Sequence, residues 1–491
     1  MFLYSVLIFF LLQTAATKSV SVETLVQQAQ QDLKAGRYAQ ARQKLKEAVK
    51  RVPDDPALWS LLGFAQGQLN ELDPAIASFE KVLALAPKDA ATCLNLGLLY
   101  WRKGDINKAL EFYQKGLELN PTDVAGNENY ALLLMGTENY REAIGPLQRA
   151  KKENSSKLPI RVALIESFFK AGMPQEGKRE SRELIQSHLA SPADEVKLAL
   201  VLLEVSQPDI AEEVLRHALV AAPDLGDAHG LLGLLNLKKG QYEDALPELR
   251  RAVQLSPDSA KYSLGLAQAL LLRKAYAEAL TFLQSVEVRF GKSSEFRYKL
   301  ALACYYSRQY PKAVSEFEKL LGQSAPRLDL VQHYLGNSYL AMGEFAKAEA
   351  CYRKAIEINP KGVANYLALA ALLTKPGVDR TDEAIPILEK AMDQDPADPR
   401  PKLQLALCYE AKKDLTQAQA LLEEITRAEP DFIPGHVELS RIYYQAGKQT
   451  EGDREKVTIT RLEGGERKKK PPADAFLSDE PAGLADDPES K

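Results

Sequence analysis

The residues that could perform chemistry in this sequence are few and dispersed. The segment Gly172-Met-Pro-Gln-Glu-Gly177-Lys178 matches the start of a phosphate-binding loop, G-x-x-x-x-G-K, in which backbone amides and a lysine hold nucleotide phosphates. The next residue is Arg179, where serine or threonine should supply a Mg²⁺ ligand, and the β-strand that must precede such a loop is missing. We therefore interpret the segment as a structural turn.

The cysteines and histidines do not have the spacing of a disulfide framework or of a zinc site, which needs two ligands a few residues apart. The four cysteines are Cys93, Cys304, Cys351 and Cys408, and the five histidines are His188, His217, His229, His333 and His436. Free cysteine is among the most buried residue types, so we expect these cysteines to be small core side chains. Sequence motifs of serine hydrolases, zinc proteases and dinucleotide-binding proteins are also missing.

The elements that must position any functional residue come from an internal repeat. In four copies a Leu-Gly pair is followed by an alanine twelve residues after the glycine, a large side chain four residues later, and a proline. The glycines are Gly63, Gly97, Gly233 and Gly336, and the prolines are Pro87, Pro121, Pro257 and Pro360. The repeat period is 34 residues, with a two-residue insertion around 375–380.

Each repeat predicts two amphipathic helices. Apolar residues recur at intervals of three and four in two segments, separated by a break such as Lys103-Gly104-Asp105. Glycine in the break can end the first helix in a left-handed conformation, and the proline closes the second helix. The small Leu-Gly and alanine positions let the two helices approach closely. Gly172 aligns with Gly104 in this register. Because one hairpin cannot bury its own apolar face, the hairpins must stack.

This pattern resembles the tetratricopeptide repeat, a helix–turn–helix unit of 34 residues. About 12–13 such units fit between Val22 and Leu462. The resemblance implies an all-α fold, a right-handed superhelical solenoid of stacked helix–turn–helix repeats. Four units match the pattern closely, and others are degraded. The stretch 158–191 has Gly177 where alanine is expected and Ser181 where the large residue belongs, and the unit 433–462 has a more polar second helix.

The two ends of the chain differ from the repeats. Phe2–Leu12 is an apolar run that is short for a membrane span, which takes about 20 residues, and it is followed by small residues suited to cleavage near Ala16. We expect residues 1–16 to be a signal peptide, although Met1–Tyr4 contain no Lys or Arg; an uncleaved anchor and a misassigned start are the alternatives. Residues 463–491 are rich in Gly, Pro and charge, so we expect a disordered charged tail.

Charge and organisation restrict the class of protein. The chain has 63 basic and 67 acidic residues, a formal net charge of −4, which gives no reason to expect nucleic acid as a partner. Beyond residue 21 no segment is long and apolar enough to span a membrane. Because the repeats run almost end to end, they leave no room for a catalytic domain. We therefore predict that the protein is not an enzyme and needs no cofactor or metal.

The resemblance also implies where partners bind, because in this family the first helix of each repeat lines the concave side of the superhelix and partner peptides lie along it. By register, the inward residues here include an apolar set and a group of tyrosines. They are Phe64, Leu94, Leu98, Trp101, Leu132, Leu302, Tyr298, Tyr305 and Tyr306, with further positions at Val162, Phe169, Leu200, Leu234, Leu264, Leu367, Leu403 and Leu407. Such a lining suits apolar or amphipathic partner segments. The alternative is that many of these side chains pack against the adjacent first helix as core.

These observations favour a protein–protein interaction scaffold or adaptor. With the signal-like N-terminus, we expect it to be exported to a periplasmic, envelope-associated or extracellular location. The alternative is a non-catalytic recruiting subunit of an enzyme complex, for example in glycan or polysaccharide synthesis or export. A carbohydrate or small-molecule binder is disfavoured because the lining has no concentrated polar pocket.

Overall fold

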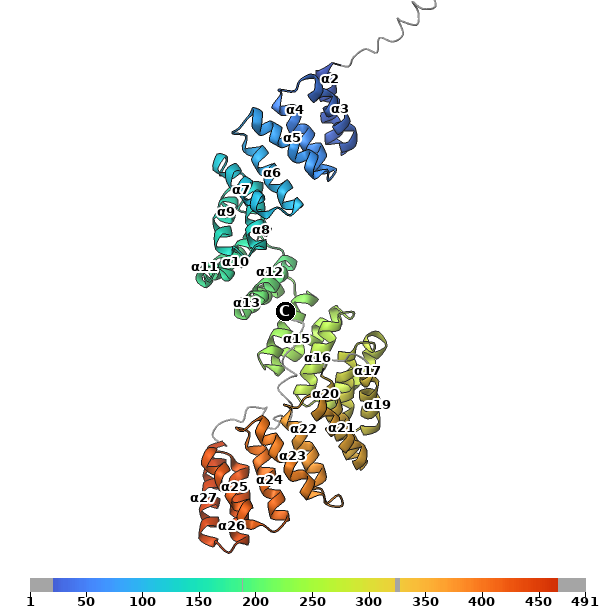
Figure 1. Ribbon diagram of the computed structural model, residues 1–491, viewed down its shortest axis with the longest axis vertical. Helices are drawn as coiled ribbons and strands as arrows, with labels where there is room; N and C mark the ends of the chain where they lie inside the picture. The colour runs from blue at the N-terminus through green and yellow to red at the C-terminus, as the bar shows by residue number, and fades with distance from the viewer. Residues whose placement is uncertain (1–20, 188, 323–326, 467–491) are drawn as a thin grey trace, which may run out of the picture. The chain divides into compact units, whose positions relative to one another are not determined.

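The computed structural model describes residues 21–187, 189–322 and 327–466, with side chains described as far as residue 464. All regular elements within these ranges are α-helices (Figure 1). None of the described helices is long and apolar enough to cross a membrane. The predicted signal peptide at 1–16 lies outside the described residues. So does the predicted tail, except for residues 463–466, which form the end of the last helix.

The helices fall into two compact units, one ending at Ala228 and the other beginning at His229. The helices of the first unit are α2 (Val22–Lys34), α3 (Tyr38–Arg51), α4 (Pro56–Gln68), α5 (Leu72–Leu85), α6 (Ala90–Lys103), α7 (Ile106–Leu119), α8 (Val124–Gly136), α9 (Tyr140–Glu153), α10 (Leu158–Lys170), α11 (Pro174–Gln186), α12 (Pro192–Glu204) and α13 (Pro208–Ala221).

Helix α14 (Gly226–Lys238) contains the boundary between the units. The helices that follow are α15 (Tyr242–Leu255), α16 (Ala260–Leu272), α17 (Tyr276–Phe290), α18 (Ser294–Tyr306), α19 (Tyr310–Leu321), α20 (Leu328–Ala341), α21 (Phe345–Ile358), α22 (Val363–Leu373), α23 (Thr381–Gln394), α24 (Pro399–Ala411), α25 (Leu415–Ala428), α26 (Ile433–Gln445) and α27 (Gln449–Glu466).

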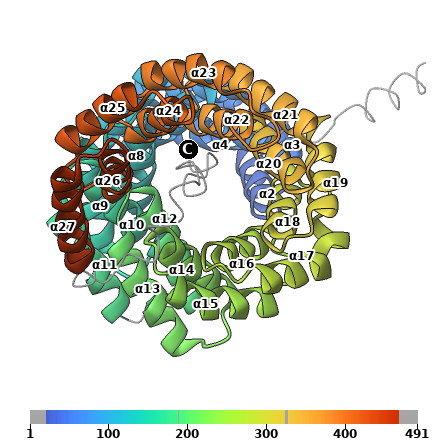
Figure 2. The ribbon, with the colours of Figure 1, turned by 90° about the horizontal axis from the view of Figure 1, so that it is seen from below.

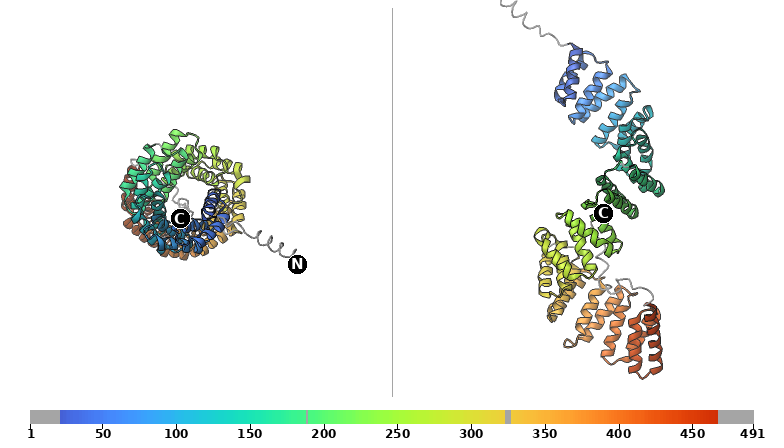
Figure 3. Two further views of the ribbon diagram at one scale, coloured as in Figure 1. Left: turned by 90° about the horizontal axis from the view of Figure 1, so that it is seen from above. Right: turned by 180° about the vertical axis from the view of Figure 1, so that it is seen from behind.

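Consecutive helices pair as hairpins, such as α4 with α5 and α20 with α21, and within each unit second helices pack against the first helix of the next hairpin, as α5 does against α6 and α19 against α20. The order of the hairpins within each unit can be followed by colour in Figure 3. The 26 described helices make thirteen such hairpins. The predicted all-α stack of helix–turn–helix repeats is therefore confirmed.

The turns between paired helices use left-handed glycines where the sequence predicts them. Gly104, Gly240 and Gly343 have φ values of +85°, +73° and +78°. Gly172 has the same conformation at φ +73°, between α10 and α11. The segment that resembles a phosphate-binding loop is therefore a helix–helix turn, with no strand before it. The two-residue insertion lies in the loop between α22 and α23, which contains Gly377 at φ +89°.

Within a hairpin, a small residue on the first helix faces a large side chain on the second. A Cβ atom placed on Gly97 would lie 2.9 Å from Cγ of Tyr113, whose side chain is fully buried. The same relation holds between Gly63 and Phe79, where the nearest ring atom would be 2.9 Å away. Real Cβ atoms do not approach carbon so closely, so glycine is what allows the ring to fill this space.

In the imperfect hairpin α10–α11, the large side chain lies on the first helix and the small residue lies on the second helix. Ile165 occupies the usual glycine position and Ser181 the usual ring position, and both are fully buried. The ring comes instead from Phe169 on α10, which covers Gly177 on α11 so closely that a Cβ there would lie 2.8 Å from it. The departure from the repeat pattern is thus compensated within the hairpin.

A recurrent hydrogen bond joins each of several hairpins to the one before it. In four repeats, a side chain near the start of the first helix donates to the carbonyl oxygen of the proline six residues earlier. The donors are Trp59 Nε1 to Pro53 at 2.7 Å, Asn127 Nδ2 to Pro121 at 2.8 Å, Tyr366 Oη to Pro360 at 2.9 Å and His436 Nε2 to Pro430 at 2.9 Å. Proline ends the second helix, so this bond satisfies a carbonyl group that would otherwise lack a helical partner.

We expect volume changes at Gly97 and Tyr113 to be energetically coupled. Gly97→Ala forces a methyl group against the ring, whereas Tyr113→Leu makes room for it. The double variant should be more stable than the sum of the single effects by about 1–2 kcal/mol. Trp101 lies one helical turn from Gly97 on α6, so its fluorescence reports unfolding. Urea denaturation curves recorded with this signal measure the coupling.

The matched control for this cycle is Gly136→Ala. Gly136 ends helix α8, and no atom lies within 4 Å of the position of its Cβ. Alanine there should leave stability unchanged or raise it by up to about 1 kcal/mol through helix propensity. Strictly additive effects in the Gly97 and Tyr113 cycle would contradict the packing account.

The four cysteines are buried, as predicted. Burial raises the pKa of the Cys304, Cys351 and Cys408 thiols to about 11, and it also raises the pKa of Cys93. Thiolate is the reactive form, and at pH 8 a thiol of pKa 11 is almost entirely protonated.

Iodoacetamide at pH 8 should therefore label the folded protein roughly 100-fold more slowly than the protein unfolded in guanidinium chloride. The rate for the folded protein should keep rising beyond pH 9, where an ordinary thiol approaches its limit. A Val288→Cys variant provides the control, because Val288 is fully exposed and its thiol should react at the ordinary rate. Equal labelling rates for the folded and unfolded protein would show that a native thiol is accessible.

Candidate protein-interaction surface

The first helices of the hairpins lie on the inner side of each unit. In the first unit α6, α8, α10 and α12 contact one another in succession, and in the second unit α16 contacts α18 and α18 contacts α20. Figure 2 shows α16, α18, α20, α22 and α24 on the inner side of the second unit, with α17, α19, α21, α23 and α25 outside them. Residues on the free face of the first helices therefore line a concave surface.

In the first unit, four apolar residues occupy the same position of the repeat, on the first helices α4, α6, α8 and α12. Phe64, Leu132 and Leu200 are 42%, 41% and 41% exposed, and Leu98 is half-buried. The other exposed large apolar side chains of the first unit lie on second helices or between helices, and they are Val52, Leu119, Leu189 and Val220. We call Phe64, Leu98, Leu132 and Leu200 the apolar row. The ring of Tyr38 makes an edge contact with Phe64, with centroids 6.4 Å apart.

One carboxyl group interrupts the apolar row. Glu166 holds the same register position between Leu132 and Leu200, and its side chain is half-buried. Burial raises the pKa of Glu166, and the nearby Glu204 raises it further, whereas Lys170 lowers it. Glu166 is thus easier to protonate than an ordinary glutamate, so the row tolerates an apolar partner better than one with a fixed negative charge.

Leu94 and Trp101 are placed differently from the apolar row. Cβ atoms on Gly116 and Gly126 would lie 2.7 and 2.8 Å from the Leu94 methyl groups, so Leu94 fills the space between α7 and α8. Trp101 is half-buried against the core cluster that contains Leu96 and Tyr113. Leu94 is therefore best interpreted as a core residue, whereas Trp101 remains partly accessible.

In the second unit, the predicted group of tyrosines is part of a larger aromatic cluster. Tyr305 lies with its ring centroid 5.1 Å from that of Tyr306 and 5.5 Å from that of Tyr334. Tyr306 stacks on Tyr276 at 4.7 Å, and its hydroxyl lies 3.2 Å from that of Tyr334. The cluster therefore joins α17, α18 and α20.

The remaining predicted residues of this region are less accessible. Leu302 is 1% exposed and belongs to the core, and Tyr298 is half-buried with its ring edge toward Phe317, 6.2 Å away between centroids. Tyr276 and Tyr334 were not among the predicted site residues. They lie 29 residues before and after Tyr305, so the 34-residue period does not relate the three positions and the repeat pattern gave no signal for them.

The other inward positions divide between surface and core. Phe169 covers Gly177 and so serves packing within its hairpin. The half-buried remainder consists of Val162, Leu234, Leu264, Leu367, Leu403 and Leu407. Among the described residues no group of His, Cys, Asp and Glu side chains could hold a metal ion. The concave surface thus offers apolar contact with scattered polar groups.

Comparisons with curated proteins find distant relatives. The chain is 26% identical over 270 residues to human Superkiller complex protein 3, covering 51% of this chain and 17% of that protein. It is 23% identical over 232 residues to bovine BBSome complex member BBS4, covering 47% of this chain and 44% of that protein. The chain therefore spans less than half the length of these relatives.

Among solved structures, the APC/C hetero-tetramer Cut9-Hcn1 is matched at a TM-score of 0.39 and 15% identity, covering 88% of this chain and 91% of that chain. Yeast Tom70 is matched at a TM-score of 0.35 and 17% identity, covering 94% and 99%. Similarity at this level carries no argument about function.

Models of the tetratricopeptide repeat match several parts of the sequence. The matched residues are 32–92 and 378–437, 90–123 and 331–361, and 196–260 and 231–294. Together they cover more than half of the chain and coincide with the stacked hairpins. The chain therefore belongs to the tetratricopeptide repeat family.

Proposed function

We propose that this protein is a scaffold that holds apolar or amphipathic segments of partner proteins along the apolar row of its first unit. The observation that carries the proposal is the exposure of Phe64, Leu132 and Leu200 on the free face of the first helices. These side chains recur at multiples of the repeat length, so they present a line of anchors rather than a single pocket. Exposed apolar groups that are aligned in this way mark interaction surfaces.

The chemistry of the row favours an extended or helical segment with its own apolar side chains. Burying one leucine side chain contributes about 1.5–3 kcal/mol, so several anchors together can supply the affinity of a specific complex. Leu98 and Trp101 add half-buried apolar area between the exposed anchors. The relatives named above are complex members by name, which agrees with a role in holding proteins together.

The proposed role needs no catalysis, since the hairpins occupy the described chain and the function rests on their surfaces. We also propose export, on the basis of the signal-like pattern of residues 1–16. A mature N-terminus near residue 17, identified by mass spectrometry of the native protein, supports this proposal, whereas intact residues 1–16 in the cytosol contradict it.

The alternative role is that of a recruiting subunit for an enzyme whose catalytic site is on another chain. Both roles use the same concave surface, so they differ in the identity of the partner. Partners that are captured through the apolar row and have glycan-synthesis or polysaccharide-export activity favour the recruiting role.

Charge introduced into the row should abolish capture. We expect Leu132→Glu combined with Leu200→Glu to reduce the amount of each specifically bound partner by at least about tenfold, because two anchors are replaced by charges that must be desolvated. Quantitative mass spectrometry after affinity capture from the native compartment measures this effect. Trp101→Ala and Tyr305→Ala test the contributions of the neighbouring aromatic residues.

Val288→Glu provides the control, because Val288 is a fully exposed apolar residue on α17, a second helix. Its partners should match those of the unaltered protein, and circular dichroism should show equal helix content for all variants. Partners that persist in full with the Leu132 and Leu200 variant would contradict binding along the row.

A further inference from the structure

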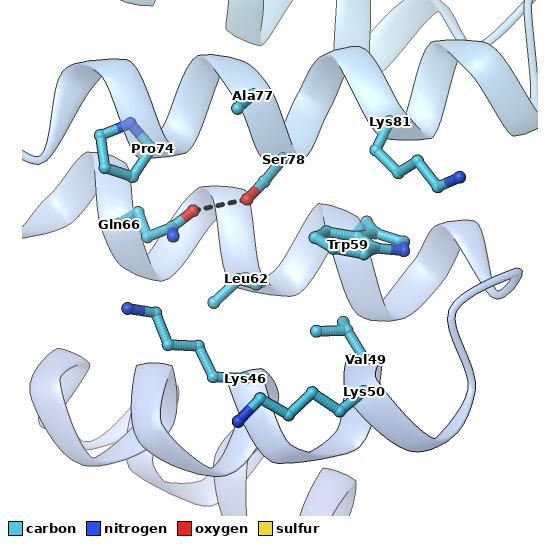
Figure 4. Close-up of a pocket in the computed structure, with 10 residues that line it drawn as sticks. All are labelled: Lys46, Val49, Lys50, Trp59, Leu62, Gln66, Pro74, Ala77, Ser78 and Lys81. Atoms are coloured by element: carbon cyan, nitrogen blue, oxygen red, sulfur yellow. Dashed lines mark hydrogen bonds between the residues drawn. The ribbon is translucent and has the colours of Figure 1, made fainter.

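A second candidate surface lies on the opposite side of α4 from the apolar row. A groove of about 580 Å³ runs between α3 and α5, with α4 as its floor (Figure 4). Trp59, Leu62 and Gln66 of α4 face the groove. At 3.6 residues per turn, Phe64 is rotated about 140° from Trp59, which places it on the other face of the helix.

The floor of the groove is apolar and fixed in shape. Leu62 and Val49 are buried, and the indole of Trp59 is held by its hydrogen bond to the carbonyl of Pro53 at 2.7 Å. Pro74 and Ala77 complete the apolar surface on the α5 side. A flat indole that is already immobilised loses little conformational entropy when a partner side chain packs on it.

One polar side chain on the floor has a donor that the described chain does not use. Gln66 is 4% exposed, and its Oε1 accepts a hydrogen bond of 2.6 Å from the Ser78 hydroxyl. The Gln66 amide nitrogen points away from Ser78 (Figure 4) and makes no hydrogen bond within the described chain. This nitrogen is not one of the described buried polar atoms that lack a partner, so it reaches the surface of the groove, where it can donate to a ligand that brings an acceptor.

Three lysines line the groove, and Lys81 lies at the end that is nearer to Trp59 than to Gln66 (Figure 4). Lys46 and Lys50 lie one turn apart on α3, and Lys81 lies on α5 across the groove (Figure 4). None of the three makes a hydrogen bond or ion pair with the rest of the described residues, and no residue that lines the groove is acidic.

Neighbouring cations on α3 are paired, in contrast. Lys44 binds Asp32 at 2.6 Å, Arg42 binds Glu71, and Arg51 binds Glu47 at 3.0 Å. On the two helices that flank the groove, the cations without an ion pair to a described residue are therefore Lys46, Lys50 and Lys81, in a chain whose net charge is −4.

We propose that this groove binds an acidic segment of a partner protein, with carboxylates at the three lysines and the Gln66 amide and an apolar side chain against Trp59 and Leu62. Carboxylates neutralise the lysines and can accept a hydrogen bond from the Gln66 amide. A polyanion without apolar groups would make no favourable contact with the apolar floor, so the groove should prefer a segment that has both carboxylates and an apolar side chain. This site is separate from the apolar row and does not depend on it.

The test uses the full chain and a fluorescein-labelled peptide with the sequence EEDFLEED. Binding is measured by fluorescence anisotropy at 50 mM and 300 mM NaCl. Lys46→Glu, Lys50→Glu and Lys81→Glu together should weaken binding at least about tenfold at low salt, and higher salt should weaken binding to the unaltered protein. Gln66→Leu and a peptide with serines in place of Phe-Leu should each weaken binding several-fold, which tests the floor separately from the charge.

The charge-matched control reverses three other lysines, Lys115, Lys152 and Lys390, which lie outside the groove. It should bind the peptide within about twofold of the unaltered protein, because long-range charge alone is screened. If the groove reversal lowers helix content, the neutral replacements Lys46→Gln, Lys50→Gln and Lys81→Gln give the decisive measurement.

Three results would overturn the proposal. The first is no measurable binding of the peptide, and the second is equal loss with the groove reversal and its control. The third is tighter binding of a single-stranded RNA oligonucleotide that is lost with the same reversal, since the groove would then be a nucleic-acid surface. The double variant Leu132→Glu, Leu200→Glu should bind the peptide as tightly as the unaltered protein does. The proposal of binding along the apolar row and the proposal of binding in this groove can therefore be rejected independently.

Discussion

The fold depends on how closely the two helices of each hairpin approach. A small residue on one helix and a large side chain on the other fill a space of nearly constant size, as Gly97 and Tyr113 do. Hairpin α10–α11 shows that the constraint is on the combined volume and shape, since Phe169 and Gly177 achieve the same packing with the large residue on the first helix. Protein interiors are packed densely enough that neither partner can change size alone.

This constraint leaves the free face of each first helix to other uses. The residues that close the hairpin point between the helices, so positions such as Leu132 and Leu200 can vary without disturbing the core. The buried ion pair between Arg161 and Glu180, at 2.8 Å, likewise lies within one hairpin and not on the concave face. Stability and recognition thus reside in different residues of the same helix.

The period of the sequence was sufficient to predict the helices, their pairing and the turns at Gly104 and Gly172, because these depend on contacts within one repeat. Exposure on the concave face depends also on the neighbouring repeats. Leu132 and Leu302 hold the same register position, yet they are 41% and 1% exposed. Leu302 belongs to a core cluster that contains Tyr334 of the next hairpin, and a single-repeat pattern does not include that neighbour.

The lysine groove was not predicted for a related reason. Lys46 and Lys50 lie on one hairpin and Lys81 on the next, and in the sequence each resembles an ordinary solvated charge. Stacking brings them around one floor, while the acidic residues nearby are occupied by Arg42, Lys44 and Arg51.

Because helix α4 contributes Phe64 to one surface and Trp59 to the other, a single first helix can support two recognition chemistries, apolar and anionic. A scaffold built in this way can hold two partners at once without any contact between their binding sites.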